Sequence, residues 1–351
     1  MIVYILLITL VGLLRMSIDI SKDHQRKIFI FFCGFLIFFF SAFKSKYLTS
    51  DTFNYALQYI KLDNEPWRFL LQTLISGKGK SPLFYIFSKI FVELGFSVQV
   101  WYAVISLLFA FSASYCIYRY SKEPYLSFIM LTSLGYYFFS MTALKQTVSI
   151  SFVLLSFKFL HERKLLKFIF IILATSLFHT SAVIFLLAYP ISRAKVNMKH
   201  ILAIPVIFLT APFISRLLSL IWFLVVPEYY YNYSESNTLL TLTGFLIQVT
   251  IFIFCYIYKN NLLKEDPKQN IFYNILIIGV FFQILASTAF AEMFRASMYF
   301  SIFSIILVPN VISKIRNSRQ KVAIYSAILF VFIGYSLYSG EYLRNYIFCW
   351  N

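Results

Sequence analysis

Long apolar blocks recur along the whole of this chain. They run for roughly 15 to 22 residues each, long enough to cross a hydrocarbon core of about 30 Å as α-helix. They do not alternate every second residue, as the strands of a transmembrane barrel would. Only 13% of the 351 residues are charged and 60% are hydrophobic, which leaves too little polar surface to coat a water-soluble particle. The blocks therefore predict an all-α, polytopic integral membrane helical bundle.

The apolar blocks predict about twelve spans within a single transmembrane domain over residues 1–351. The first block has no cation before it and no small-residue cleavage site after it, so an uncleaved span is expected there rather than a signal peptide. The expected spans are residues 2–14, 28–43, 98–118, 125–143, 147–160, 165–178, 181–191, 201–225, 239–258, 271–291, 293–312 and 322–339.

The cations lie mostly between the apolar blocks. The formal net charge is +17, and 19 of the 31 Lys and Arg residues fall in six short linkers. These linkers are residues 15–27, 119–122, 163–167, 193–199, 259–268 and 314–321. Placing all six in the cytoplasm satisfies the positive-inside rule and puts both chain ends outside, so the basicity indicates orientation and not nucleic-acid binding. No Walker or GxGxxG motif is present to suggest a nucleotide site.

Two apolar stretches do not fit a simple span. Residues 83–95 carry Lys89 and Glu93, and we expect a re-entrant or interfacial helix on the outer side. One helix over residues 165–191 would place Arg193 outside, so a pair of short helices that turns near His179 fits the charges better. Broken helices at membrane depth are tolerated only where protein or a water-filled cavity surrounds them, and such a break suggests a site.

Two longer segments are expected outside the membrane. Residues 44–82 form the larger one and contain amphipathic patterns at 53–62 and 67–75. Residues 227–238 form the second and are rich in tyrosine. Their tyrosines and tryptophans have two interpretations, an interfacial aromatic belt or stacking surfaces for sugar rings.

Four polar groups lie at the expected outer ends of spans, and two of them are in the first half of the chain. Asp51 either caps a helix that begins near Phe53 or supplies a carboxylate that accepts a proton from a hydroxyl. Lys145 and Gln146 fall at an outer turn, where the lysine either extends to the interface or holds a phosphate.

The other two polar groups come later in the chain. His179 has apolar neighbours and is either a core histidine or an imidazole that acts as base or donor. Glu292 and Arg295 are three residues apart, a spacing that permits a mutual ion pair, but Arg295 is also suited to binding an anion such as phosphate. One topology places all four groups outside. A carboxylate, an imidazole and two cations there suit chemistry on a lipid-linked diphosphate.

Four short motifs in these positions resemble those of the EpsG-like branch of Wzy-type polysaccharide polymerases, in the same order and over nearly the whole chain. Lysine stands at 145 where the family pattern has arginine, and it cannot reproduce a bidentate guanidinium contact. The matching residues are Asp51 and Tyr55; Lys145 and Gln146; His179, Ser181 and Ala182; and Arg295, Tyr299 and Phe300.

The resemblance implies a fold similar to lipid-dependent, GT-C-like membrane glycosyltransferases. It also implies a multi-pass protein of the bacterial cytoplasmic membrane whose outward-facing site polymerises undecaprenyl-diphosphate-linked oligosaccharides into capsule, O-antigen or exopolysaccharide. A flippase and a chain-length regulator are the expected protein partners, and no metal or cofactor is expected. The implied catalytic residues are Asp51, His179 and Arg295, and the implied substrate-binding residues are Lys145, Gln146, Tyr55, Tyr299 and Glu292.

Two other functions remain open from the residues. A flippase or transporter of the same lipid-linked glycans would need charges deep in a central cavity and internal repeats, and we find no convincing repeat in the sequence. A membrane acyltransferase that decorates glycans would need an acyl donor to reach its base.

Overall fold

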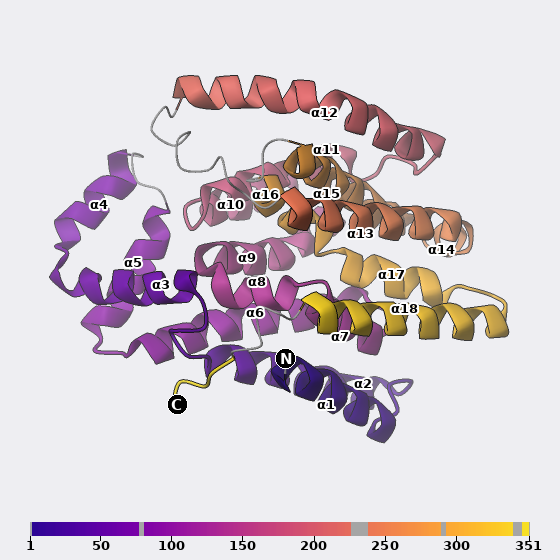
Figure 1. Ribbon diagram of the computed structural model, residues 1–351, viewed down its shortest axis with the longest axis horizontal. Helices are drawn as coiled ribbons and strands as arrows, with labels where there is room; N and C mark the ends of the chain where they lie inside the picture. The colour runs from indigo at the N-terminus through magenta and orange to yellow at the C-terminus, as the bar shows by residue number, and fades with distance from the viewer. Residues whose placement is uncertain (1, 77–80, 226–237, 289–292, 340–345, 351) are drawn as a thin grey trace. The chain divides into compact units, whose positions relative to one another are not determined.

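The computed structural model describes residues 2–76, 81–225, 238–288, 293–339 and 346–350 (Figure 1). These residues form α-helices and short 3-10 helices joined by turns. The β pairing within the described ranges is one antiparallel bridge between Lys44 and Phe348. The all-α prediction is therefore confirmed.

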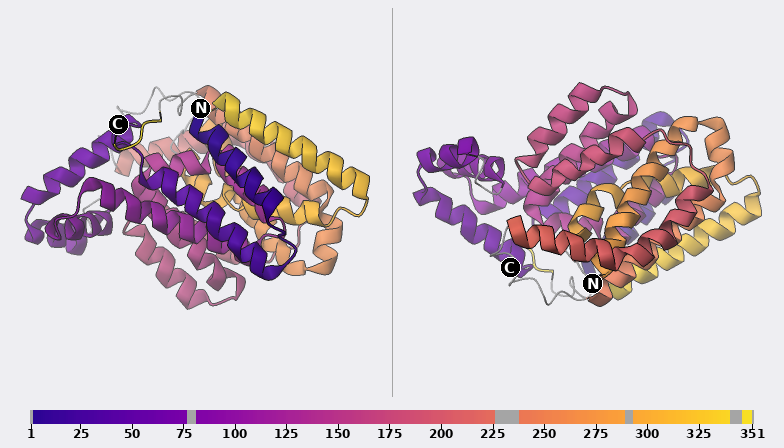
Figure 2. Two further views of the ribbon diagram at one scale, coloured as in Figure 1. Left: turned by 90° about the horizontal axis from the view of Figure 1, so that it is seen from below. Right: turned by 90° about the horizontal axis from the view of Figure 1, so that it is seen from above.

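The chain divides into two compact units, which are described separately. The first unit contains Met1–Val183 and Arg316–Asn351. Figure 2 shows its indigo helices α1 and α2 running side by side. Its helices are α1 (Ile2–Ser17), α2 (Asp23–Ala42), α3 (Ser50–Lys61), η1 (Leu62–Asn64), α4 (Trp67–Ser76), α5 (Pro82–Glu93), α6 (Val98–Tyr120), α7 (Pro124–Ser133), α8 (Tyr136–Thr142), α9 (Leu144–His161), α10 (Leu165–Ser176) and α18 (Ser318–Ser339).

The second unit contains Ile184–Ile315 and is built around α15, which packs against α12, α13 and α16. Gly279 of α15 permits the close approach of α16, because a Cβ there would lie 3.1 Å from the backbone nitrogen of Ser301. Its helices are α11 (Ala188–Ile191), α12 (Met198–Val225), α13 (Thr238–Ile257), α14 (Lys259–Glu265), η4 (Pro267–Gln269), α15 (Asn270–Thr288), α16 (Met293–Ser301) and α17 (Ser304–Ser313). The 3-10 helix η2 (Thr180–Leu187) crosses the boundary between the units.

Several helices have the length and composition of membrane spans. Four in the described ranges are long and apolar enough, and a bent pair raises the number to five. The α2 helix shows the exposed apolar surface expected of a membrane span. Phe29 and Cys33 are buried against the protein, whereas Phe31, on the other side of the helix, is 68% exposed. An exposed apolar face of this kind is stable against lipid but not against water. The prediction of an integral membrane protein is confirmed, and the total of about twelve spans stays a prediction.

One predicted span is interrupted. Residues 125–143 were expected to form a continuous helix, but α7 ends at Ser133 and α8 begins at Tyr136. The interruption lies at Gly135, whose φ of +81° is in the left-handed region that favours glycine. The prediction of one continuous helix is therefore wrong here, because a single backbone conformation ends α7 within the apolar run.

The structure supports the expected break near His179 and the helix over 83–95. The α10 helix ends at Ser176 and η2 begins at Thr180, which leaves His179 between two short apolar helices.

The α5 helix contains a buried lysine. Lys89 of α5 is buried, forms a 2.7 Å ion pair with Glu93, and donates to the carbonyl oxygen of Leu62 at 2.8 Å. Pairing of this kind offsets the desolvation of the buried lysine.

Candidate functional site

The α3 helix carries two of the predicted site residues. Its capping box is made by Thr49 and Thr52: each side-chain oxygen accepts a hydrogen bond from the other residue's backbone N–H, at 3.2 and 2.9 Å. The alternative that Asp51 caps this helix is therefore wrong. Asp51 lies instead in the first turn with an exposed side chain, where the helix dipole favours a carboxylate.

One face of α3 gathers polar side chains. Asp51, Tyr55 and Gln58 are spaced four and three residues apart, so they lie on one side of the helix. The side that carries Thr52 and Tyr59 is buried and is fixed to the rest of the unit by hydrogen bonds. One of them runs from the Tyr102 hydroxyl of α6 to the carbonyl oxygen of Thr52, at 2.6 Å. This attachment orients the polar face.

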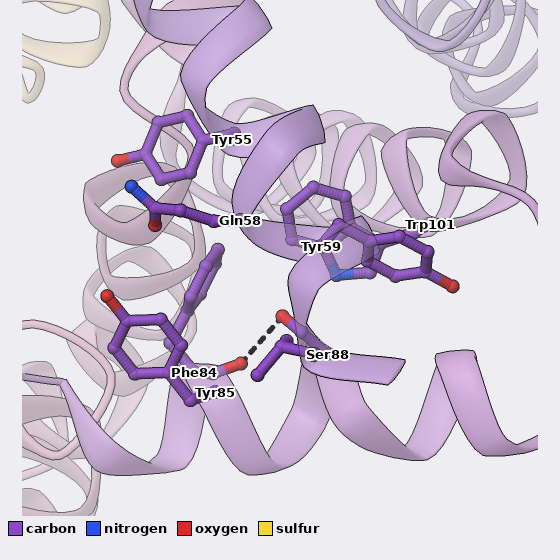
Figure 3. A pocket seen from close by; sticks show the side chains of 8 residues that line it. Tyr55, Gln58, Tyr59, Phe84, Tyr85, Ser88 and Trp101 are labelled. Carbon is purple, nitrogen blue, oxygen red and sulfur yellow. Dashed lines mark hydrogen bonds between the residues drawn. The ribbon is translucent and has the colours of Figure 1, made fainter. Parts of the chain in front are cut away.

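A narrow hollow lies between α3, α5 and α6 (Figure 3), and it is too tight to hold a water molecule. Its buried wall is aromatic: the Trp101 ring lies 5.0 Å from the Tyr59 ring and 5.6 Å from the Phe84 ring, centroid to centroid. The hollow is lined by Tyr55, Gln58, Tyr59, Leu62, Phe84, Tyr85, Ser88 and Trp101.

Lys145 stands at the start of α9 and meets the lining of this hollow. Its Nζ donates a 2.7 Å hydrogen bond to the Tyr85 hydroxyl and lies 4.3, 5.6 and 5.9 Å from the ring centroids of Tyr85, Phe84 and Tyr55. These distances are in the range of cation–π attraction. In the described part of the chain, no carboxylate forms an ion pair with Lys145. A half-buried cation held by neutral groups in this way keeps its charge available to an anion.

The break that carries His179 adjoins the same end of α5. The backbone N–H of Leu83 donates to the carbonyl oxygen of Leu177 at 3.1 Å, and the ring of Phe178 packs 6.5 Å from that of Phe87. His179 itself is half-buried. The first turns of α5 thus contact both Lys145, through Tyr85, and the segment that precedes His179.

The remaining predicted residues have other environments. Gln146 is buried next to Lys145. Arg295 and Tyr299 belong to the second unit, on α16, where Arg295 is exposed and Tyr299 is fully buried. Glu292 and the tyrosine-rich residues 227–237 lie outside the described residues. The prediction that all four polar groups share one face stays a prediction.

Lys44 is a titratable group that the sequence analysis missed. It follows α2, is fully buried, and donates from Nζ to the carbonyl oxygen of Ser41 at 3.0 Å, with the Tyr102 ring centroid 4.6 Å away. Burial lowers the pKa of this amine to about 7. The sequence places Lys44 at the end of an apolar run, where a lysine is ordinarily expected to reach the interface. Tyr102 connects it to the first turn of α3.

No group of three or more His, Cys, Asp or Glu side chains within the described ranges is placed to hold a metal ion. The arrangement consists instead of a cation, neutral hydroxyl and amide groups, and aromatic rings. The Lys145 cation in this arrangement suits the binding of an anion.

Comparison with known proteins agrees with the resemblance seen in the motifs. Curated proteins and solved structures gave no match. The EpsG family model, in contrast, matches residues 27–347, nearly the whole chain, and this range contains every candidate residue from Asp51 to Tyr299. The chain therefore belongs to the EpsG family.

Proposed function

We propose that this membrane protein is a polysaccharide polymerase that joins undecaprenyl-diphosphate-linked oligosaccharide repeat units. Membership of the EpsG family supports a polymerase-like role. The single observation that carries the chemical assignment is Lys145, a half-buried cation that neutral hydroxyl and aromatic groups hold beside the hollow. Such a cation is suited to a phosphate group at the membrane.

The proposed reaction is a glycosyl transfer between two lipid-linked glycans. The oxygen of an acceptor sugar hydroxyl attacks the anomeric carbon of the donor glycan, and the bond from that carbon to the diphosphate oxygen breaks. The electron pair leaves with undecaprenyl diphosphate, and the hydroxyl proton passes to a base. The leaving diphosphate supplies the energy, so no nucleotide is consumed.

Each predicted residue has a role in this proposal. Lys145 and Arg295 stabilise negative charge on the diphosphate, and His179 or Asp51 accepts the hydroxyl proton. The remaining four residues orient or bind the substrate: Tyr55, Gln146, Glu292 and Tyr299.

The proposed membrane arrangement follows the charge distribution. It comprises about twelve spans in a GT-C-like fold in the bacterial cytoplasmic membrane, with the six basic linkers inside and the reacting groups outside. Its product is a surface or extracellular polysaccharide, and the expected partners are a flippase that delivers the repeat units and a chain-length regulator.

Replacement of Lys145 tests the role of this cation. In a strain that lacks the chromosomal gene, we expect Lys145→Met to lower polymer synthesis by about 10² to 10³, a loss typical for the removal of one charge-stabilising group. Lys145→Arg should restore polymer, because arginine is the residue in the family pattern. Surface glycan separated by electrophoresis reports the outcome.

The matched control for this experiment is Lys158→Met, at the other end of α9 and also half-buried. It should leave the polymer ladder unchanged, and immunoblots should show equal protein in all strains. Full-length polymer from Lys145→Met at wild-type abundance would contradict the assignment.

The phenotype of the deletion strain distinguishes a polymerase from the two other candidate functions, a flippase and an acyltransferase. A polymerase deletion leaves single repeat units on the outer surface. Loss of a flippase instead leaves lipid-linked units inside the cell. Loss of an acyltransferase leaves the polymer length normal and removes only the acyl groups.

A further inference from the structure

Three buried polar side chains meet among the apolar helices of the second unit. The side-chain oxygen of Gln283 on α15 lies 2.9 Å from the Ser297 hydroxyl of α16 and 3.4 Å from the Gln248 amide nitrogen of α13, and both groups donate to it. Gln283 and Ser297 are fully buried, and Gln248 is 8% exposed. Polar side chains are costly within membrane-spanning helices, and they usually fix the position of a helix or serve a function.

Two contacts one turn apart fix α16 against α15. Gly279 and Gln283 are four residues apart on α15, and Ser297 and Ser301 are four residues apart on α16, so each pair lies along one side of its helix. The close approach of Gly279 to the Ser301 backbone sets the distance between the two helices. The hydrogen bond from Ser297 to Gln283, one turn away, sets the rotation of α16 about its own axis.

The rotation of α16 determines where Arg295 points. Arg295 precedes Ser297 by two residues, which is about 200° around an α-helix, so the two side chains leave nearly opposite sides of α16. Ser297 is fully buried and Arg295 is exposed, as this angle requires. A rotation or slide of α16 by a fraction of a turn would therefore move the guanidinium away from its present place.

The α13 helix confines the Gln283 amide on its other side. A Cβ at Gly244 would lie 2.8 Å from Gln283 Nε2, so a side chain at this position would displace the amide. Gln248 follows Gly244 by one turn, lies on the same side of α13, and donates to the same amide oxygen. The contacts from α13 thus hold the Gln283 side chain in reach of Ser297.

We propose that Gln283 is a positioning residue, which acts through Ser297 to hold the guanidinium of Arg295 where it binds the diphosphate. Gln283 itself does not touch the substrate. The inference rests on the proposed polymerase function and on the role of Arg295 in it, and it extends that role to a buried residue on a neighbouring helix. Positioning of this kind matters for the rate, because a displacement of about 1 Å can cost about 10².

A double-mutant cycle with Arg295 tests the inference. The initial rate of polymer formation is measured with the full-length protein in detergent and with the lipid-linked repeat unit extracted from the deletion strain. We expect Ser297→Ala and Gln283→Leu each to lower this rate about tenfold, a moderate loss for a misplaced charge-stabilising group. In an Arg295→Ala protein, which has lost the group to be positioned, the same substitutions should change the rate less than about twofold.

The matched control removes another buried amide of the second unit. Asn310 of α17 is fully buried, and its amide nitrogen donates to the side-chain oxygen of Gln269 at 3.0 Å. Asn310→Leu should change the rate by the same factor with and without Arg295, because its effect is on packing alone. Ser297→Ala removes only a hydroxyl group and keeps the test valid if Gln283→Leu fails to fold.

The outcomes separate the positioning role from the polymerase assignment. Equal factors for Ser297→Ala with and without Arg295 would show that the buried cluster only stabilises the fold, and would overturn the positioning role. Wild-type rates from Ser297→Ala and from folded Gln283→Leu would also overturn it, even where gene deletion abolishes polymer. Normal polymer in the deletion strain would overturn the polymerase function instead.

Discussion

Lys44 shows how one residue couples burial to stability. Its amine is fully buried, and the described part of the chain supplies a carbonyl oxygen and an aromatic face but no carboxylate to pair with it. Its pKa is about 7 in the folded protein and about 10.4 in an unfolded chain. Between these values the unfolded state holds the proton and the folded state does not, so stability must rise with pH in that window.

Lys44→Met should remove this dependence. We expect the wild-type free energy of unfolding to rise between about pH 7 and pH 10, by at most about 1.4 kcal/mol per pH unit, and the Met variant to be the more stable protein near pH 7. Below pH 7 both states hold the proton and the difference is constant. Thermal unfolding in detergent at pH 7.5 and 9.5 measures the effect. Lys46→Met, at an exposed neighbour, is the control, and an unchanged pH slope in Lys44→Met would refute the interpretation.

Arg295 is the residue on which the proposed chemistry in the second unit depends. Its side chain is exposed at the start of α16. We expect Arg295→Ala to lower polymer synthesis by about 10² to 10³ and to leave single repeat units on lipid. Surface-glycan electrophoresis measures the loss, with Arg319→Ala at an exposed position in the first turn of α18 as the control. A normal ladder from Arg295→Ala at equal protein abundance would rule out its role in diphosphate binding.

At the scale of elements, the break between α7 and α8 depends on one backbone conformation. Gly135 has φ +81°, where a Cβ is strained even though nothing lies within 4 Å of its position. Gly135→Ala should therefore lower stability by about 1 kcal/mol.

Gly334 provides the opposite case within the same unit. It lies inside α18 with open space around its Cβ position, so Gly334→Ala should raise stability by about 0.5 to 1 kcal/mol. Thermal unfolding of the two variants, measured side by side, tests whether Gly135→Ala lowers and Gly334→Ala raises the stability of the protein. Equal effects of the two substitutions would show that the left-handed conformation does not control the break.

The helices outside the apolar blocks were predictable from residue spacing. The amphipathic patterns at 53–62 and 67–75 correspond to α3 (Ser50–Lys61) and α4 (Trp67–Ser76). The start of α3 was not predictable to the residue, because Ser50, Asp51 and Thr49 are all acceptable caps and only their hydrogen bonds distinguish them. The break at Gly135 was missed because an apolar run with a single glycine is compatible with a continuous helix.

At the scale of the whole molecule, orientation in the membrane is the central prediction. The positive-inside rule places Lys195 in the cytoplasm only if residues 165–191 cross twice, and it places Ser50 outside. Both residues are exposed, so single cysteines at either position are accessible to a reagent. Of the native cysteines, Cys33, Cys116 and Cys255 are buried and Cys349 is exposed. Both single-cysteine substitutions are therefore made in a Cys349→Ser protein, which removes the exposed native thiol.

In intact cells, a membrane-impermeant maleimide should label Ser50→Cys and should label Lys195→Cys only after the membrane is opened. Labelling of Lys195→Cys in intact cells would mean that residues 165–191 cross once. It would also reverse the assignment of every later linker.

The sequence by itself determined the class of the protein, an all-α membrane protein of the EpsG family, because apolar length and motif order are properties of the chain. It also named Tyr55 and Lys145 as site residues. Only the tertiary structure showed that the Lys145 Nζ lies 5.9 Å from the Tyr55 ring and bonds to Tyr85, and that Trp101 and Lys44 are buried. The physical reason is distance along the chain: Lys145 and Tyr85 are 60 residues apart, and no local spacing encodes their 2.7 Å contact.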